Sequence, residues 1–206
     1  MANFRTNFCI CILLTTAVCT VLAAQEGART DDIVLDAESG TFNRQTNLFE
    51  ARHPRIAQGN MRIEADESSG VDLEQASEWR FTGHVKITVD TALLEADSAV
   101  FTFDGKQLSR AELEGKPAAF TAPEKADQKP VRGSAGRLDY DREAHTLRLY
   151  EGAWIHKGEV QIQGCDLIYD FNDGGVKSGS TECGELFRIR VPKKSEQQAP
   201  PAAPPQ

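Results

Sequence analysis

The sequence has few of the residue patterns on which enzymes and metal sites depend. It contains four histidines, and none has a second His or Cys three or four positions away, the spacing that a helical zinc site needs. Residues 133–136 (GSAG) lack the residue that separates Gly from Ser in a nucleophile elbow. We therefore predict no enzymatic activity, no cofactor and no metal site.

Positive charge is also scarce. Asp and Glu total 31 against 23 Lys and Arg, which gives a formal net charge of −8 at pH 7. No basic cluster stands out that could neutralise a phosphate backbone, so we predict no nucleic-acid partner. The acids concentrate at predicted turns, where we expect them to accept hydrogen bonds from backbone amides or to face solvent: Asp66, Asp104, Asp170 and Asp173.

Long apolar runs are confined to the N-terminus. Arg5 is followed by an apolar run over residues 8–22 and then by Ala23. This order is typical of a secretory signal peptide, which we place at residues 1–23, and an uncleaved N-terminal anchor is the alternative. The sequence therefore predicts an exported protein.

Cysteines are few outside that segment. Three of the five lie within it, which leaves Cys165 and Cys183. Disulfides persist in the oxidising compartment that export implies, and both residues lie near predicted neighbouring strands. We predict a Cys165–Cys183 disulfide, and two buried, unpaired thiols are the alternative.

Large aliphatic and aromatic residues are sparse for a chain of this length. After position 23 only 37 residues are Leu, Ile, Val or Phe. That number is low for a compact core, but the regular alternation of these residues argues against disorder. The composition favours an elongated sheet with a thin interior, or one that leaves apolar surface for a ligand.

What the sequence does contain is one strand-turn-strand unit used several times. In residues 81–105 the apolar side chains alternate with polar ones, a period of two that predicts strands. Residues 150–174 repeat this stretch, with Gly83 matched by Gly152 and Asp97 by Asp166. Looser copies cover residues 47–70 and 131–141. The chain is therefore predicted to be all-β and built from stacked repeats.

We predict one domain, over residues 31–191. It begins with a possible edge strand at residues 33–36 and ends with a strand at residues 187–191. Three prolines between positions 105 and 131 exclude a long helix there, although residues 118–120 can form a strand. Residues 192–206 contain five prolines and no apolar periodicity, which predicts a disordered Pro/Ala-rich tail.

One apolar stripe runs through the predicted strands. By alternation it includes Phe81, Phe101, Phe103, Phe120, Leu138, Tyr140, Leu149 and Tyr169. Such a stripe is ordinarily core. A folded-over sheet would instead enclose a long apolar groove, and composition alone leaves both readings open.

Several of these segments resemble, in order and spacing, the OstA-like family of periplasmic lipopolysaccharide-transport bridge proteins. The resemblance covers about residues 61–191, and its most specific part is residues 115–120 (GKPAAF) followed by residues 130–133 (PVRG). The other matching segments are residues 61–66, 81–85, 133–140 and 162–169. The chain departs from the family pattern in an extra unit at residues 31–60, a longer stretch between Asp66 and Phe81, and the Cys165/Cys183 pair.

The resemblance implies a single open, twisted antiparallel β-jellyroll in the periplasm. Such a protein binds the acyl chains of lipopolysaccharide inside and stacks head-to-tail between inner-membrane and outer-membrane components of the transport machinery. It implies that Phe120 and Tyr140 face the lipid, and alternation adds Met61, Ile63, Phe101, Phe103 and Leu138. The alternatives are a structural or adaptor β-module and a periplasmic carrier of another lipid.

An open stack of strands must also have two unpaired edges. At the C-terminal edge Phe187, Ile189 and Val191 alternate with arginines. At the other edge Ile33 and Leu35 offer a matching apolar face, with Met61 and Ile63 as the next candidates. Because exposed strand edges can pair with further strands, we predict self-association by joining these two edges.

Overall fold

A computed structural model describes residues 32–71, 77–104, 107–123, 129–180, 184 and 186–192. The predicted signal peptide, nearly all of the predicted tail and Cys183 lie outside these residues. All regular structure in the described part is β-strand, and the predicted all-β class is confirmed. No helix in the described ranges is long and apolar enough to cross a membrane.

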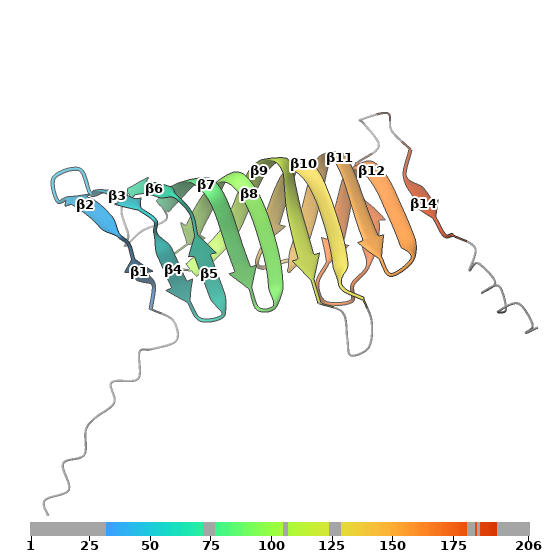
Figure 1. Ribbon diagram of the computed structural model, residues 1–206, viewed down its shortest axis with the longest axis horizontal. Coiled ribbons are helices and arrows are strands. Elements are labelled where there is room, and N and C mark those ends of the chain that lie inside the picture. The colour runs from blue at the N-terminus through green and yellow to red at the C-terminus, as the bar shows by residue number, and fades with distance from the viewer. Residues whose placement is uncertain are drawn as a thin grey trace, which may run out of the picture.

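Fourteen strands form one sheet, and every pairing between them is antiparallel. Figure 1 shows them side by side along the long axis of the molecule, in nearly the order of the chain. The strands are β1 (Val34–Asp36), β2 (Ser39–Asn43), β3 (Leu48–Arg52), β4 (Arg55–Gln58), β5 (Met61–Glu64), β6 (Glu67–Val71), β7 (Ser77–Val89), β8 (Ala92–Asp104), β9 (Gln107–Ala122), β10 (Val131–Asp141), β11 (Thr146–Lys157), β12 (Val160–Asp170), β13 (Val176–Ser178) and β14 (Arg188–Arg190).

The six long strands, β7 to β12, each bend near the middle. The pairing register shifts between Thr82 and Val85 where β7 meets β8, and between Tyr150 and Ala153 where β11 meets β12. Extra residues at such bulges bend a strand and increase its twist. The sheet therefore folds over into two facing walls joined along one bend, the open jellyroll that the family resemblance implied.

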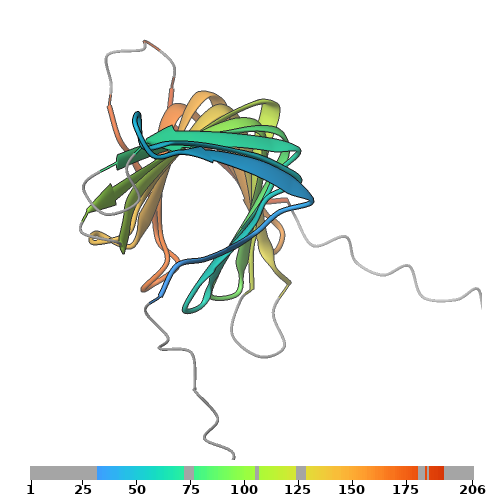
Figure 2. The same cartoon turned by 90° about the vertical axis from the view of Figure 1, so that its left-hand side faces the viewer.

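We name the two walls by their end strands. Wall A runs from β1 through β4, β5 and one half of each long strand to β14, which pairs with residues 161–163 of β12. Wall B runs from β2 through β3, β6 and the other half of each long strand to β13, which pairs with residues 167–169 of β12. Figure 2, viewed along the stack, shows the two walls facing each other.

The sequence repeat marks the bend. Gly83 and Gly152, which the repeat equates, have φ angles of 76° and 74°, a left-handed conformation that favours glycine. At Gly83 a side chain would also collide with Asp66. Asp66 accepts a hydrogen bond from His84 Nδ1 at 2.7 Å and donates its backbone N–H to Gly83 O at 2.9 Å. Glycine is thus required here both by the turn and by this close approach.

Pro117 lies within β9, a longer strand than the segment 118–120 that the sequence predicted. In the pairing of β9 with β10 the register passes from Ala118 to Glu114, so Pro117 falls in the bulge between them. A proline is tolerated at a bulge because no ladder N–H is needed there. This is why the strand continues through it.

Candidate binding interior and sheet edges

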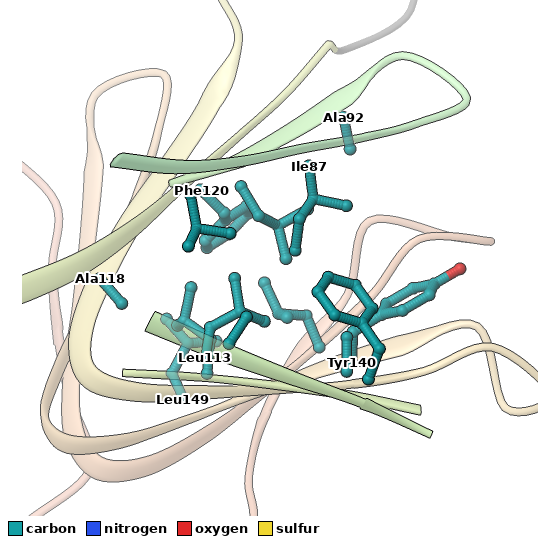
Figure 3. Packing of buried hydrophobic residues seen from close by; sticks show 14 of the residues in the cluster. Ile87, Ala92, Leu113, Ala118, Phe120, Tyr140 and Leu149 are labelled. Carbon is teal, nitrogen blue, oxygen red and sulfur yellow. The ribbon is translucent and has the colours of Figure 1, made fainter. Parts of the chain in front are cut away.

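The interior lies between the walls and is apolar along its length. Figure 3 shows Ile87 and Phe120 of wall A facing Leu113, Tyr140 and Leu149 of wall B. Aromatic rings follow one another through it: Phe81 and Phe101 lie 4.9 Å apart in an edge-to-face pair, and Phe120 and Tyr169 lie 5.2 Å apart. Alternation along each strand turns these side chains inward.

All seven residues predicted to contact lipid lie in this interior. Their exposed fractions range from 0% at Ile63 to 7% at Met61. Wall A supplies Met61 and Ile63 from β5 and Phe120 from β9, whereas wall B supplies Phe101 and Phe103 from β8 and Leu138 and Tyr140 from β10. The inward face is therefore as the alternation predicted. That these residues bind lipid stays a prediction.

The packing of the interior also bears on whether the apolar stripe forms a filled core or an open groove. The inward side chains of the two walls pack against each other as one cluster, with Phe81, Leu113 and Leu149 each 0% exposed. An apolar ligand could lie between the walls only by replacing these contacts with its own. The two walls share their strands at the bend, so separation would occur on the opposite side.

That opposite side, which we call the seam, is where hairpin turns of the two walls meet. Asp90 in the β7–β8 turn of wall A lies 3.8 Å (Oδ2 to Nε2) from His145 in the β10–β11 turn of wall B. Lys157, at the end of β11 in wall A, donates from Nζ to Gly174 O of the β12–β13 turn at 2.9 Å. In the described ranges no backbone ladder spans the seam, so side-chain contacts hold it.

Two pockets open at the seam, one on each side of the Asp90–His145 pair. One measures about 540 Å³, and its lining includes Gln58, Asn60, Leu108 and Arg142. The other measures about 120 Å³ and is lined by Ala92, Ala122, Tyr169 and Phe171, among others. Val89, Asp90, Tyr140 and His145 line both. The interior thus approaches the surface at this pair.

Electrostatics differ sharply between the two faces of the sheet. Inside, burial raises the pKa of the Tyr140 phenol above its usual value, and the charge of Asp90 adds to that effect. Outside, Arg148 Nε and Nη2 donate to the two carboxylate oxygens of Asp166 at 2.8 and 2.5 Å, and Arg110 donates to Asp139 at 2.9 Å. These two ion pairs lie on the outer face, whereas the side chains that pack between the walls are mainly hydrocarbon.

Each end of the stack presents two edge strands, one for each wall. Ile33 and Leu35, at the β1 edge, are half-buried, whereas Phe187, Ile189 and Val191, around β14, are exposed by 41%, 55% and 68%. The β14 strand is shorter than the predicted 187–191. Met61 and Ile63 are not edge candidates, because β5 is paired on both sides.

The sequence did not predict that each end of the stack has a second edge strand. At the N-terminal end it is β2, where Phe42 is 52% exposed, and at the C-terminal end it is β13. It also missed the seam residues Asp90, Arg142 and His145. The short strands gave little periodicity, and nothing in sequence spacing brings two turns from different hairpins together.

Cys165 lies within β12, at the bend. It is disulfide-bonded. Its predicted partner Cys183 lies outside the described residues, so the pairing itself stays a prediction. Within the described ranges, no group of three or more His, Cys, Asp or Glu residues could hold a metal ion.

The fold and interior define a class: an open antiparallel jellyroll with an apolar interior between two walls and unpaired strands at both ends. A model of the family described as LptA/(LptD N-terminal domain) LPS transport protein matches residues 62–174, more than half of the chain. The chain belongs to this family, which confirms the resemblance seen in the sequence.

The chain is also similar to individual proteins of this family. The chain is 27% identical over 134 residues to the lipopolysaccharide export system protein LptA of Escherichia coli strain K12, covering 64% of this chain and 71% of that protein. It is 24% identical over 133 residues to LptA of Haemophilus influenzae, covering 64% and 77%. The crystal structure of LptH from Pseudomonas aeruginosa, described as an LptA-homologous periplasmic component of the lipopolysaccharide transport device, matches with a TM-score of 0.52 at 15% identity, covering 80% of this chain and 97% of that one. This last likeness shows a shared fold.

Proposed function

We propose that this protein carries lipopolysaccharide through the periplasm, with the acyl chains held between walls A and B. One observation carries the proposal: the inward side chains form a single apolar cluster from β4 to β12, which leaves out only the edge strands, β3 and β6 of the described sheet. Burying hydrocarbon there contributes about 25 cal/mol per Å² of apolar area removed from water. Affinity for this anionic lipid would thus come mainly from its chains, since the protein is itself acidic, with a net charge of −8.

The site that we propose for the acyl chains consists of Met61, Ile63, Phe101, Phe103, Phe120, Leu138 and Tyr140. These side chains come from both walls, so chains lying between the walls would touch all of them. The walls are continuous at the bend, and among the described residues they are joined at the seam by side-chain contacts. Opening at the seam would make room without breaking the sheet.

We further propose that copies join end to end, in contact with inner-membrane and outer-membrane components of the same machinery. Each wall contains an even number of strands and all neighbours are antiparallel. The first and last strands of a wall therefore run in opposite directions. When a second copy is added, β14 would meet β1 and β13 would meet β2 as antiparallel neighbours, and the sheet would continue in both walls.

The side chains at these edges match. Pairing of β1 with β4 turns Leu35 inward and Asp36 outward, and pairing of β14 with β12 turns Ile189 inward and Arg188 outward. If Leu35 lies opposite Ile189 of the next copy, Asp36 lies opposite Arg188. Opposite charges on directly facing residues stabilise an antiparallel pair.

Wall B offers a second apolar match. Phe42, on β2, pairs with Phe49, and Val176, on β13, pairs with the inward Tyr169. Both Phe42 and Val176 therefore lie on the inner face at opposite ends of the molecule. Joining the two ends would cover the exposed Phe42 ring and make the apolar interior continuous between copies.

Mass spectrometry of lipid that co-purifies with the protein from its native periplasm tests the proposed cargo. We expect lipopolysaccharide at a constant ratio to protein. Phospholipid alone would favour a carrier of another lipid. No lipid in a preparation that still associates end to end would favour an adaptor module.

A further inference from the structure

The larger seam pocket combines an apolar lip that leads to the interior with the side chain of Arg142, which does not line the smaller seam pocket. Its lip consists of Met61, Val89, Leu108 and Tyr140, and its rim of Gln58, Asn60, Asp90, Gln107, Arg142 and His145. Apolar and polar groups thus face each other across about 540 Å³. This is the pattern that an amphiphile requires at the point where its chains end and its polar head begins.

Two other surface pockets lack that connection. A pocket of about 750 Å³ lies outside the bend, with charged residues such as Glu114, Lys116 and Arg137 in its lining. A pocket of about 460 Å³ lies over β2, β3 and β6, with Glu50, Arg52 and others in its lining. Neither is lined by a large interior side chain, so neither is placed to receive the head of a lipid whose chains lie inside.

Two cationic or potentially cationic side chains reach the larger seam pocket from the β10–β11 turn. The exposed guanidinium of Arg142 makes one hydrogen bond among the described residues, a long one of 3.4 Å from Nη1 to Leu108 O. Its remaining N–H groups are available to an acceptor. A guanidinium binds phosphate oxygens well because its donors lie in a planar fork.

His145 is oriented toward the same pocket. Its Nδ1 donates to Asn172 Oδ1 at 3.0 Å, because an amide oxygen only accepts. Its ring also lies 5.5 Å from the ring of Phe171. With Nδ1 engaged and the ring packed, Nε2 is the nitrogen directed across the seam, where Asp90 now lies at 3.8 Å.

We propose that this pocket binds the anionic, phosphate-bearing head of the carried lipid, with Arg142 and His145 as the groups that contact the phosphate. The proposal rests on the proposed function, because it takes the acyl chains to lie between the walls. The bend is closed by continuous strands, and in the proposed end-to-end assembly each end of the stack meets another copy. A head group attached to chains in the middle of the stack would therefore leave at the seam. The larger pocket is the part of the seam where an apolar lip and these two side chains coincide.

Asp90 acts in this scheme as the anion that the phosphate replaces. Its Oδ1 accepts a hydrogen bond from Asn60 Nδ2 at 2.5 Å and its Oδ2 faces His145, so it bridges the seam in the protein alone. A phosphate at Arg142 and His145 would repel this carboxylate and take its place beside His145. Binding of the lipid would then also break the Asp90–His145 contact across the seam.

Substitution of Asp90 should therefore change the preference for phosphorylated lipid in the opposite direction to substitution of Arg142 and His145. The measurement is competition with a fluorescent acyl probe in detergent, using diphosphorylated lipid A and the same lipid A with its phosphates removed. We compare wild type, an Arg142→Ala/His145→Ala variant, and Asp90→Asn. Arg132→Ala, an exposed arginine at the other end of β10, is the matched control.

We expect wild type and Arg132→Ala to prefer the phosphorylated lipid by about tenfold, the effect of one or two charge-assisted hydrogen bonds. The double variant should lose this preference and keep its affinity for the dephosphorylated lipid. Asp90→Asn should increase the preference, because the competing carboxylate is gone.

A double variant that keeps the preference, or that weakens both lipids equally, would overturn the head-group site. So would displacement of phosphorylated lipid by equimolar inorganic phosphate, which would indicate an anion site independent of the chains. If wild type bound neither lipid, the proposed carriage of lipid would itself be wrong. Thermal unfolding of each variant separates loss of the site from loss of the fold.

Discussion

Arg148 and Asp166 form a two-point ion pair between β11 and β12, on the outer face beside the bend, with both guanidinium–carboxylate distances below 3 Å. Asp166 is 5% exposed, whereas the side chain of Arg148 is 38% exposed. The pair raises the pKa of Arg148 through its hydrogen bonds with Asp166. A buried carboxylate thus depends on a partner that lies partly in solvent.

We predict that Arg148→Ala lowers the free energy of unfolding by about 1–3 kcal/mol, since it leaves Asp166 without its cation and solvent compensates only in part. Arg148→Ala/Asp166→Asn should cost less than the sum of the two single changes. A double-mutant cycle by urea denaturation gives the coupling. Additive single effects would show that the pair contributes nothing.

Tyr140 should make stability depend on alkaline pH. Its folded-state pKa is raised above the ordinary value of 10.0, by burial and then by Asp90. The contribution is therefore fully present below the unfolded-state pKa and is lost as pH rises through the folded one. We predict that the unfolding free energy falls above about pH 10, and that Tyr140→Phe shows a smaller fall. Equal slopes in the two proteins would assign the loss to other groups.

The predicted Cys165–Cys183 disulfide can be tested by alkylation. Protein isolated from its native host without reductant should react with a thiol reagent at both positions only after reduction. In the chain-entropy model a loop of this length contributes roughly 3 kcal/mol, so reduction should lower the denaturation midpoint. Labelling of both thiols before reduction would contradict the bridge.

End-to-end joining through wall A predicts a charge swap. Arg188→Asp and Asp36→Arg should each weaken self-association about fivefold, because each places like charges opposite one another, and the two together should restore it. Ile189→Pro should abolish association, because proline blocks the strand ladder.

Sedimentation at several protein concentrations measures these effects, with Arg132→Asp, away from both edges, as the control. If Ile189→Pro gave the same concentration-dependent oligomers as wild type, β14 would not be the joint. Failure of the two charge changes to compensate each other would leave β14 as the joint and reject the register that pairs Asp36 with Arg188.

The inner surface could be predicted from the sequence because strand periodicity is local. Within each half of a long strand alternate residues face inward, so Phe101, Phe103 and Leu138 were placed correctly without any tertiary information. The alternation changes phase only at the bulge, as between Leu94 and Ala99. The glycines that the repeat equates also lie where the strands bend, since Gly83 and Gly152 take the same left-handed conformation.

The seam and the doubled edges could not be predicted in this way. The contact of Asp90 with His145 depends on how far the sheet twists and closes, which is set by all the bulges together. Short strands such as β2 and β13 are defined by their partners rather than by their own pattern. Histidine spacing in the sequence was informative only about metal sites, so it could not show that His145 meets Asp90 across the fold.

The central claim is that lipid lies between the walls, and site-specific photo-crosslinking tests it most directly. A photoreactive residue would replace Phe120 or Tyr140 inside, and Thr102 or Arg148 on the outer face, in protein expressed in its native host. We predict that the two inner positions capture lipopolysaccharide and the two outer positions do not. Equal capture at all four positions would contradict the account.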